Sequence, residues 1–325
     1  MTDLHNRLHG LWLPLVTPFR DGALDTASLR NLIRHYAAQP IEGLVLGATS
    51  GEGLALSLLE LATLVEVVRD ELAMIRRELP ICLGLTGAAT ARVIEALDAT
   101  APWPIDCYLI SSPFYVRPSQ RGLLAHFTGL AERAAHPILL YNIPYRSSVG
   151  LENETLLRLA EHPSIVGCKD CCANRAQTRE LLRLRPAGFR VLTGEDAQSF
   201  DALQAGADGA ILLSAHVETA TFAAIQTHLK AGNHAAAAAL WERVSELTRL
   251  LFTEPSPAPA KYWLARIGLI DSPQVRLPMV EVGEALAARL DQEIARRPAA
   301  AAAAGCWLMR SSKPVQMRAI SRPGS

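Results

Sequence analysis

One lysine in this chain of 325 residues stands where an amine nucleophile would be useful. The lysines of the chain are Lys169, Lys230, Lys261 and Lys313. Lys169 directly follows the apolar run 164–168. Burial disfavours the ammonium form and lowers the pKa of a lysine, which frees its amine to attack a carbonyl carbon. We therefore predict that Lys169 forms a Schiff base with a 2-oxo acid, and we assign the other three lysines no chemical role. The alternative is a structural lysine paired with Asp170 or a nearby glutamate.

Residues that can move protons and bind an anion accompany this lysine. Tyr141 ends one apolar run and Tyr115 lies in the loop after another. Their hydroxyls can pass protons when they are chained to a threonine such as Thr49. The turn 49–51, with the sequence Thr-Ser-Gly, opens a helical segment and can offer N–H groups and hydroxyls to a carboxylate.

Eight short apolar runs, separated by segments with helical spacing, indicate the fold that must bring these residues together. The runs are continuous and do not alternate, as expected for parallel strands buried on both faces. Eight repeats of strand and helix predict an α/β protein, a (β/α)8 or TIM barrel. An open doubly wound sheet is the alternative, but no Gly-x-Gly-x-x-Gly turn follows the first run. The runs are residues 11–16, 44–46, 81–85, 105–110, 138–141, 165–168, 189–192 and 210–213.

In such a barrel the reactive side chains lie at the C-terminal ends of the strands, so the residues that close the apolar runs are the candidates. Lys169 is the only lysine among them. The candidates are Thr17, residues 49–52, Thr86, residues 111–115, Tyr141, Asn142, Lys169, Asp170, Gly194, Glu195 and Ser214.

We expect four parts along the chain: an N-terminal segment (1–10), a catalytic (β/α)8 barrel (11–232), a C-terminal helical extension (233–297) and a tail (298–325). Helical spacing continues after the eighth run and predicts the extension. The tail has a polyalanine run followed by polar residues without periodicity, and we expect it to be disordered.

Composition and charge exclude several classes of function. The chain has 32 Lys plus Arg and 32 Asp plus Glu, so it has no basic excess for nucleic acid or an anionic membrane. No stretch reaches the roughly 18 apolar residues of a membrane-spanning helix, and residues 1–10 do not resemble a secretory signal. We therefore expect a cytoplasmic protein with reduced cysteines, whose partners are small molecules or further copies of itself.

A Cys-x-x-Cys spacing at Cys168 and Cys171 offers a redox pair or half a zinc site as a further alternative. A second ligand pair is missing from the sequence, and Cys168 would lie inside a buried strand. The histidines are scattered without the spacing of metal ligands. We predict no metal and therefore no metal-dependent aldolase.

Six segments, in order along the chain, resemble the dihydrodipicolinate synthase and N-acetylneuraminate lyase family of pyruvate-dependent class I aldolases. The resemblance runs from about residue 10 to 296. The segments are residues 15–19 (LVTPF), 47–52 (GATSGE), 112–115 (SPFY), 141–144 (YNIP), 167–169 (GCK) and 206–209 (GADG).

The resemblance implies a role for each site residue. Lys169 would form the Schiff base with pyruvate without a further cofactor, and Tyr141 would shuttle protons through Thr49 and Tyr115. Thr49 and Ser50 would hold the pyruvate carboxylate. Gly194 and the carbonyl of Ile211 would line the pocket. Tyr115 would come from a neighbouring subunit, and the family assembly is a tetramer of two tight dimers.

Within the family, Arg146 favours a synthase. Similar synthases have an arginine here that binds the carboxylate of aspartate semialdehyde as a fork, and the neuraminate lyases generally lack it. Tyr145 is bulkier than the residue usual in the family, and residues 147–148 are Ser-Ser in place of Thr-Gly. A different aldolase or dehydratase, acting on a sugar-acid or aromatic aldehyde adduct, therefore remains an alternative. So does a non-catalytic pyruvate-binding protein.

Members of the family that are inhibited by lysine resemble one another in polar residues at a subunit interface. The matching positions in this chain are apolar: Leu58, Leu61, Ala89 and Val93. Apolar side chains cannot bind the charged groups of an amino acid. We therefore expect no feedback inhibition by lysine.

Overall fold

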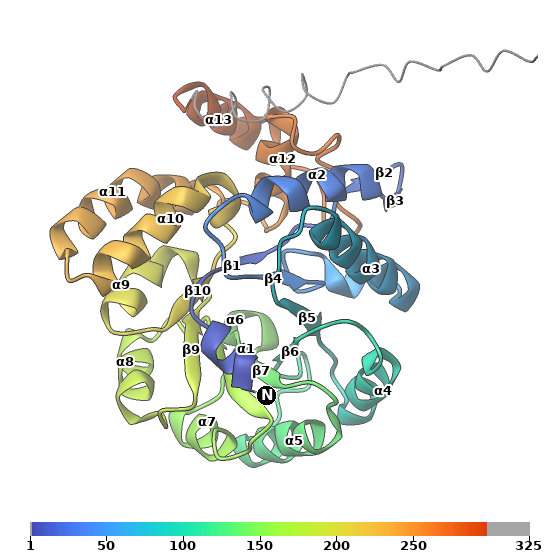
Figure 1. Ribbon diagram of the computed structural model, residues 1–325, viewed down its shortest axis with the longest axis vertical. Coiled ribbons are helices and arrows are strands. Elements are labelled where there is room, and N and C mark those ends of the chain that lie inside the picture. Colours follow the sequence, from blue (N-terminus) through green and yellow to red (C-terminus); the bar gives the residue numbers. More distant parts are fainter. Residues whose placement is uncertain (1, 298–325) are drawn as a thin grey trace, which may run out of the picture.

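The structure, a computed structural model, describes residues 2–297, and its centre is a closed barrel of eight parallel strands (Figure 1). Each strand pairs with the next along the chain, and the last closes on the first. The predicted barrel is confirmed, and the alternative of an open sheet is wrong. The strands are β1 (Gly10–Pro14), β4 (Gly43–Leu46), β5 (Ile81–Leu85), β6 (Cys107–Ser111), β7 (Ile138–Asn142), β8 (Ile165–Asp170), β9 (Arg190–Thr193) and β10 (Gly209–Ile211).

Helices surround the barrel and carry the chain from one strand to the next (Figure 1). The connecting helices are α2 (Thr26–Ala37), α3 (Leu58–Met74), α4 (Thr90–Thr100), α5 (Gln120–Arg133), α6 (Pro144–Ser147), α7 (Asn153–Leu159), α8 (Arg175–Leu184) and α9 (Ser199–Gln204). Two single turns, η1 (Gly53–Ala55) and η2 (Asp196–Gln198), precede α3 and α9. Within residues 2–297, no helix is long and apolar enough to cross a membrane.

Side chains of the strands alternate between two separate apolar clusters. One cluster fills the barrel and includes Trp12, Leu109 and Leu139. The other packs the outer faces of the strands against the helices. Helix α1 (Thr2–Arg7) leads into the bottom of the barrel, where the Trp12 indole donates hydrogen bonds to the carbonyls of Arg7 and His9. The opposite end, at the strand C-termini, carries the candidate residues.

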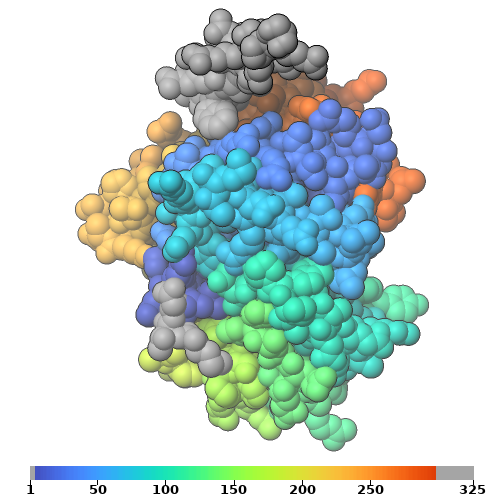
Figure 2. Space-filling view, turned by 45° about the vertical axis from the view of Figure 1, so that its right-hand side comes forward, coloured from blue at the N-terminus to red at the C-terminus, as the bar shows by residue number. Residues whose placement is uncertain are grey.

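The C-terminal helices lie against the beginning of the chain. They are α10 (Ala215–Lys230), α11 (His234–Leu250), α12 (Ala258–Arg266) and α13 (Glu284–Ala295). Helix α12 lies beside α2 (Figure 1), and the loop after α12 meets the hairpin of β2 (Phe19–Arg20) and β3 (Ala23–Leu24), where Arg276 donates a hydrogen bond to the carbonyl of Gly22. The orange C-terminal residues touch the blue N-terminal ones (Figure 2). The predicted division at residue 232 stays a prediction, and the predicted disordered tail lies outside the described residues.

The cluster inside the barrel should contribute strongly to stability, and Leu139 tests this expectation. Leu139 is fully buried on β7, two residues before Tyr141. We expect Leu139→Ala to lower the free energy of unfolding by about 2–5 kcal/mol, because it leaves a cavity in a closed core. Urea-induced unfolding measures this change. Leu59→Ala is the control, since Leu59 is 77% exposed, and its effect should stay within about 0.5 kcal/mol. Equal effects of the two variants would contradict the assignment.

Candidate active site

Lys169 lies near the C-terminal end of β8, and its side chain is buried. In the sheet it is paired with Tyr141 on β7 and with Leu192 on β9. The residue is only 4% exposed, and its Nζ lies 4.3 Å from the centre of the Tyr141 ring. Burial lowers the pKa of Lys169. Within residues 2–297, no carboxylate forms an ion pair with this ammonium group. The site therefore disfavours the charged form of this amine.

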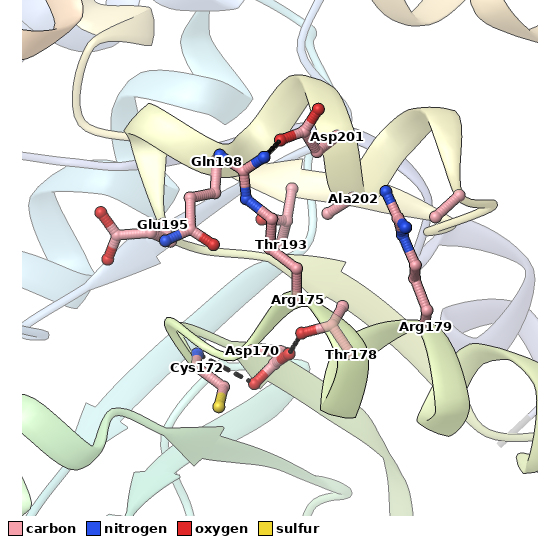
Figure 3. Close-up of a pocket in the computed structure, with 11 residues that line it drawn as sticks. Asp170, Cys172, Arg175, Thr178, Arg179, Thr193, Glu195, Gln198, Asp201 and Ala202 are labelled. Atoms are coloured by element: carbon pink, nitrogen blue, oxygen red, sulfur yellow. Dashed lines mark hydrogen bonds and ion pairs between the residues drawn. The ribbon is translucent and has the colours of Figure 1, made fainter.

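The carboxylate next to Lys169 in the sequence points away from it. Asp170 accepts hydrogen bonds from the Thr178 hydroxyl at 2.6 Å, from the Asn142 amide at 3.0 Å and from the Cys172 N–H at 3.1 Å. Figure 3 shows Asp170 directed toward Thr178 and Cys172. Successive residues of a strand face opposite sides, so Lys169 and Asp170 cannot share one side of β8. The alternative of a structural Lys169–Asp170 pair is therefore wrong.

Asp170 instead lines a small polar pocket outside the barrel, between α8 and α9 (Figure 3). The ion pair of Arg175 and Asp201 crosses this pocket at 2.5 Å. The other lining residues are Cys172, Thr178, Arg179, Thr193, Glu195, Gln198, Ala202 and Ala205. Because Lys169 does not line it, this pocket is separate from the candidate reaction centre.

Tyr141 lies between Lys169 and the turn after β4. Its ring is buried, which raises the pKa of the phenol well above the ordinary value, while a hydrogen bond with Thr49 lowers it. The phenol therefore keeps its proton and can donate it. The structure thus brings Lys169, Tyr141 and Thr49 together from three different strands, as the sequence predicted.

The turn of residues 49–52 is closed by its backbone. The N–H of Glu52 donates to the carbonyl of Thr49 at 3.1 Å, and the Thr17 hydroxyl donates to the carbonyl of Gly51 at 2.7 Å. Ser50 is buried within this turn. Gly53 follows it, and any Cβ at that position would lie 1.6 Å from the carbonyl oxygen of Gly47. Only glycine fits there, so the compact turn depends on it.

Gly194 and Ile211 occupy neighbouring strand ends. The N–H of Gly194, just after β9, donates to the carbonyl of Asp170 at 2.8 Å. A Cβ on Gly194 would lie 2.3 Å from Cε of Lys169, so the lysine side chain passes directly over this glycine. Ile211 ends β10 and packs in the same interior cluster as Tyr141. Both residues therefore lie at the same rim of the barrel as Lys169 and Tyr141.

Arg146 and Tyr115 are on the surface of this chain. Arg146 lies on α6, exposed, with its guanidinium carbon 5.7 Å from the centre of the Tyr145 ring. Its charge is near enough to lower the pKa of Lys169 and Tyr141. Tyr115 is 88% exposed and has a left-handed backbone with a φ of 70°. It does not pack into the barrel mouth of its own chain.

Cys171 is a neighbour of the site that the sequence did not indicate. Its thiol is buried, and a Cβ on Gly194 would lie 2.6 Å from its Sγ. Burial raises its pKa to about 12, so it remains a thiol. The period of two along a strand could have placed it beside Lys169, because the two residues are two apart. Cys168 packs in the outer cluster and Cys171 in the interior one, so the Cys-x-x-Cys residues face opposite sides.

Lys261 makes a contact that the sequence did not indicate. It is fully buried and forms an ion pair with Glu52, the last residue of the turn that carries Thr49. Its sequence position after a proline-rich segment indicates nothing of this contact, which joins residues 209 positions apart.

Within residues 2–297, no group of three or more His, Cys, Asp or Glu side chains could hold a metal ion.

The contact between Gly194 and Lys169 leads to a test of the site. We expect Gly194→Ala to lower the rate at which Lys169 forms a borohydride-trapped adduct with a 2-oxo acid by about a hundredfold, because the new methyl group displaces the amine. Intact-mass spectrometry measures the adduct. Gly129→Ala is the matched control, since nothing lies within 4 Å of a Cβ there, and it should behave as the unchanged protein. Adduct formation at the unchanged rate in Gly194→Ala would contradict this geometry.

The chain is similar to known proteins over nearly its whole length. The model of the dihydrodipicolinate synthetase family matches residues 7–296. A relative from Clostridium acetobutylicum, 4-hydroxy-tetrahydrodipicolinate synthase 2, is 40% identical over 288 residues, which are 88% of this chain and 99% of that protein.

Solved structures match the fold as well. The chloride-inhibited dihydrodipicolinate synthase from Acinetobacter baumannii, complexed with pyruvate, is 29% identical with a TM-score of 0.84, covering 91% of this chain and 99% of that one. The synthase from Cyanidioschyzon merolae with lysine bound is 28% identical with a TM-score of 0.84, over 91% and 99% of the two chains. With the family model spanning nearly every described residue, the chain belongs to the dihydrodipicolinate synthetase family.

Proposed function

We propose that the protein is a 4-hydroxy-tetrahydrodipicolinate synthase, which condenses pyruvate with L-aspartate-4-semialdehyde in the biosynthesis of diaminopimelate and lysine. The observation that carries the proposal is the buried amine of Lys169, without an ion pair in the described residues, against the ring of Tyr141. The relative from Clostridium acetobutylicum carries the name of this activity, and the similar structure from Acinetobacter baumannii binds pyruvate.

The first half of the reaction uses the amine of Lys169. The neutral amine attacks the ketone carbon of pyruvate, the ketone oxygen leaves as water, and an iminium remains on Nζ. Tyr141, with Thr49, supplies the proton that the departing oxygen needs. Thr49 and Ser50 hold the pyruvate carboxylate at the turn. The phenolate of Tyr141 then takes a proton from the methyl group, which leaves an enamine, and no cofactor beyond the covalent Schiff base takes part.

The second half forms the new carbon–carbon bond. The enamine carbon attacks the aldehyde carbon of the semialdehyde. The aldehyde oxygen then takes a proton and becomes the 4-hydroxyl group. The amine of the semialdehyde then attacks the iminium carbon and releases Lys169, which closes the ring. Arg146 binds the carboxylate of this second substrate, because a guanidinium fork matches two carboxylate oxygens. Gly194 and Ile211 line the pocket.

We propose a homotetramer, a dimer of dimers, in which Tyr115 completes the proton relay of a neighbouring subunit. The exposed ring of Tyr115 and the exposed side chain of Val116 beside it support this proposal. An aromatic side chain that faces solvent gains little free energy, whereas its burial at a subunit interface is favourable. We place the enzyme in the cytoplasm, with residues 11–232 as catalytic barrel and 233–297 as helical extension.

We also propose that lysine does not inhibit this enzyme. The synthase from Cyanidioschyzon merolae has been solved with lysine bound. Here Leu61 and Val93 are buried, and Leu58 and Ala89 are exposed apolar residues. None of the four can pair with a charged amine or carboxylate.

The Schiff base is tested by chemical trapping. Borohydride added with pyruvate should reduce the imine and leave the adduct on a peptide that contains Lys169. Lys169→Ala should give no adduct and lose more than about a thousandfold in kcat while keeping its fold, because the nucleophile is gone. Lys230→Ala, at an exposed lysine, should react as the unchanged enzyme does. A protein that gains no mass with pyruvate and borohydride would refute the Schiff base.

The second substrate is tested at Arg146. We expect Arg146→Ala to raise the KM for aspartate semialdehyde by about ten- to a hundredfold, since hydrogen bonds to charged groups are worth about 1.5–3 kcal/mol. The KM for pyruvate should not change, and Arg146→Lys should restore part of the affinity. If aspartate semialdehyde is not turned over but a sugar or aromatic aldehyde is, the enzyme is another aldolase of the family. Both kinds of aldehyde have to be compared, because the bulky side chain of Tyr145 lies beside Arg146.

A further inference from the structure

The most buried ion pair outside the reaction centre joins the C-terminal helices to the turn of residues 49–52. Nζ of Lys261, on α12, donates to Oε1 of Glu52 at 2.9 Å. The side chain of Lys261 is fully buried and that of Glu52 is 4% exposed. Removing two charges from water costs several kcal/mol for each ion before their attraction is counted. A pair buried this deeply therefore adds little to the free energy of unfolding.

Glu52 is held at both carboxylate oxygens. Its Oε2 accepts the backbone N–H of Arg276 at 2.8 Å. The ring of Phe19 contacts both cations of this cluster, with Nζ of Lys261 at 4.4 Å and the guanidinium carbon of Arg276 at 4.3 Å from its centre. The guanidinium of Arg276 is itself paired with Glu60 at 2.5 Å. Every charge of the cluster therefore has a partner, and Glu52 has no freedom to turn.

The backbone of Glu52 needs such a restraint. Its φ of 52° and ψ of 36° are left-handed, a conformation that is unfavourable for a residue with a Cβ. The same residue donates its N–H to the carbonyl of Thr49 and so closes the turn. The side chain of Glu52 thus fixes the conformation of the turn whose Thr49 hydroxyl is hydrogen-bonded to Tyr141. Thr17 fixes the other side of the turn through the carbonyl of Gly51.

We propose that Glu52 and Lys261 are positioning residues for pyruvate binding: their ion pair lets helix α12 hold the turn of residues 49–52 in the shape that receives the pyruvate carboxylate. The proposal rests on the role proposed above for Thr49 and Ser50. It assigns helix α12 a part in substrate affinity through Glu52. Lys261 itself does not react, because its ammonium is bound to a carboxylate.

The double variant Glu52→Gln with Lys261→Met tests the proposal. It removes both charges, keeps similar volumes, and leaves neither partner as an unpaired buried ion, so it should fold. Each single variant should melt at a lower temperature than the double one, because it strands one buried charge. If the double variant does not fold, Glu52→Asp replaces it, because the shorter side chain cannot reach both Lys261 and Arg276.

The measurement is borohydride trapping of the folded variant over a range of pyruvate concentrations. We expect the half-saturating concentration of pyruvate to rise about tenfold, because the turn is no longer held for the carboxylate. Lys230→Met, which removes the charge of an exposed lysine, should leave it unchanged. A purely structural pair would lower the fraction of active molecules and leave the half-saturating concentration alone. That result would overturn the proposal.

The unchanged enzyme separates this proposal from the proposed function. If the unchanged enzyme forms no adduct at any pyruvate concentration, the Schiff-base function fails and the positioning role fails with it. If it does form the adduct and the half-saturating concentration is the same in the variant, only the positioning role fails.

Discussion

This site is arranged around one constraint. The amine of Lys169 is buried, and no carboxylate among the described residues forms an ion pair with it. An ammonium group at the end of a barrel strand would normally need a carboxylate partner, since an unpaired buried charge is costly. The lowered pKa of Lys169 relieves this cost, because the group can exist as the neutral amine. The surroundings keep it so: Asp170 is directed to the outside of the barrel, and the nearest aromatic face is that of Tyr141.

Two buried lysines in this chain show opposite solutions to the same problem. Burial lowers the pKa of both Lys169 and Lys261. Lys261, however, lies against the carboxylate of Glu52, whose charge and hydrogen bond favour the ammonium form. Lys261 is thereby kept as a cation that organises the turn of residues 49–52. Lys169 is the proposed nucleophile. The difference lies in the neighbours and not in the depth of burial.

The barrel explains how residues from distant parts of the chain act together. Thr49, Tyr141 and Lys169 lie at the ends of β4, β7 and β8, or just beyond them, and parallel strands that close on themselves bring such ends to one rim. The interior cluster below this rim, together with α1 at the opposite end, gives the rim a rigid base. The C-terminal helices then reach the same rim from outside through Lys261 and Arg276.

Much of this arrangement could be predicted because it depends on local patterns. Continuous apolar runs predict buried parallel strands, their number predicts a closed barrel, and the residue that ends a run lies near the rim. Lys169, Tyr141 and Thr49 were found in this way. Gly194 also closes a run, but its role, like the choice of Ile211, came only from the resemblance to a family, because neither residue has side-chain chemistry that a pattern could reveal.

The tertiary structure alone decided the rest, because it depends on which side chains meet across long sequence separations. The sequence determined the order of strands and helices and the strand end at which Lys169, the proposed nucleophile, lies. It could not determine that Lys261 reaches Glu52 or that Arg276 reaches Glu60. Contacts of this kind are set by how the helices pack on the closed barrel. Local spacing in the sequence cannot predict them, because the two partners of each pair interact only after folding has buried them together.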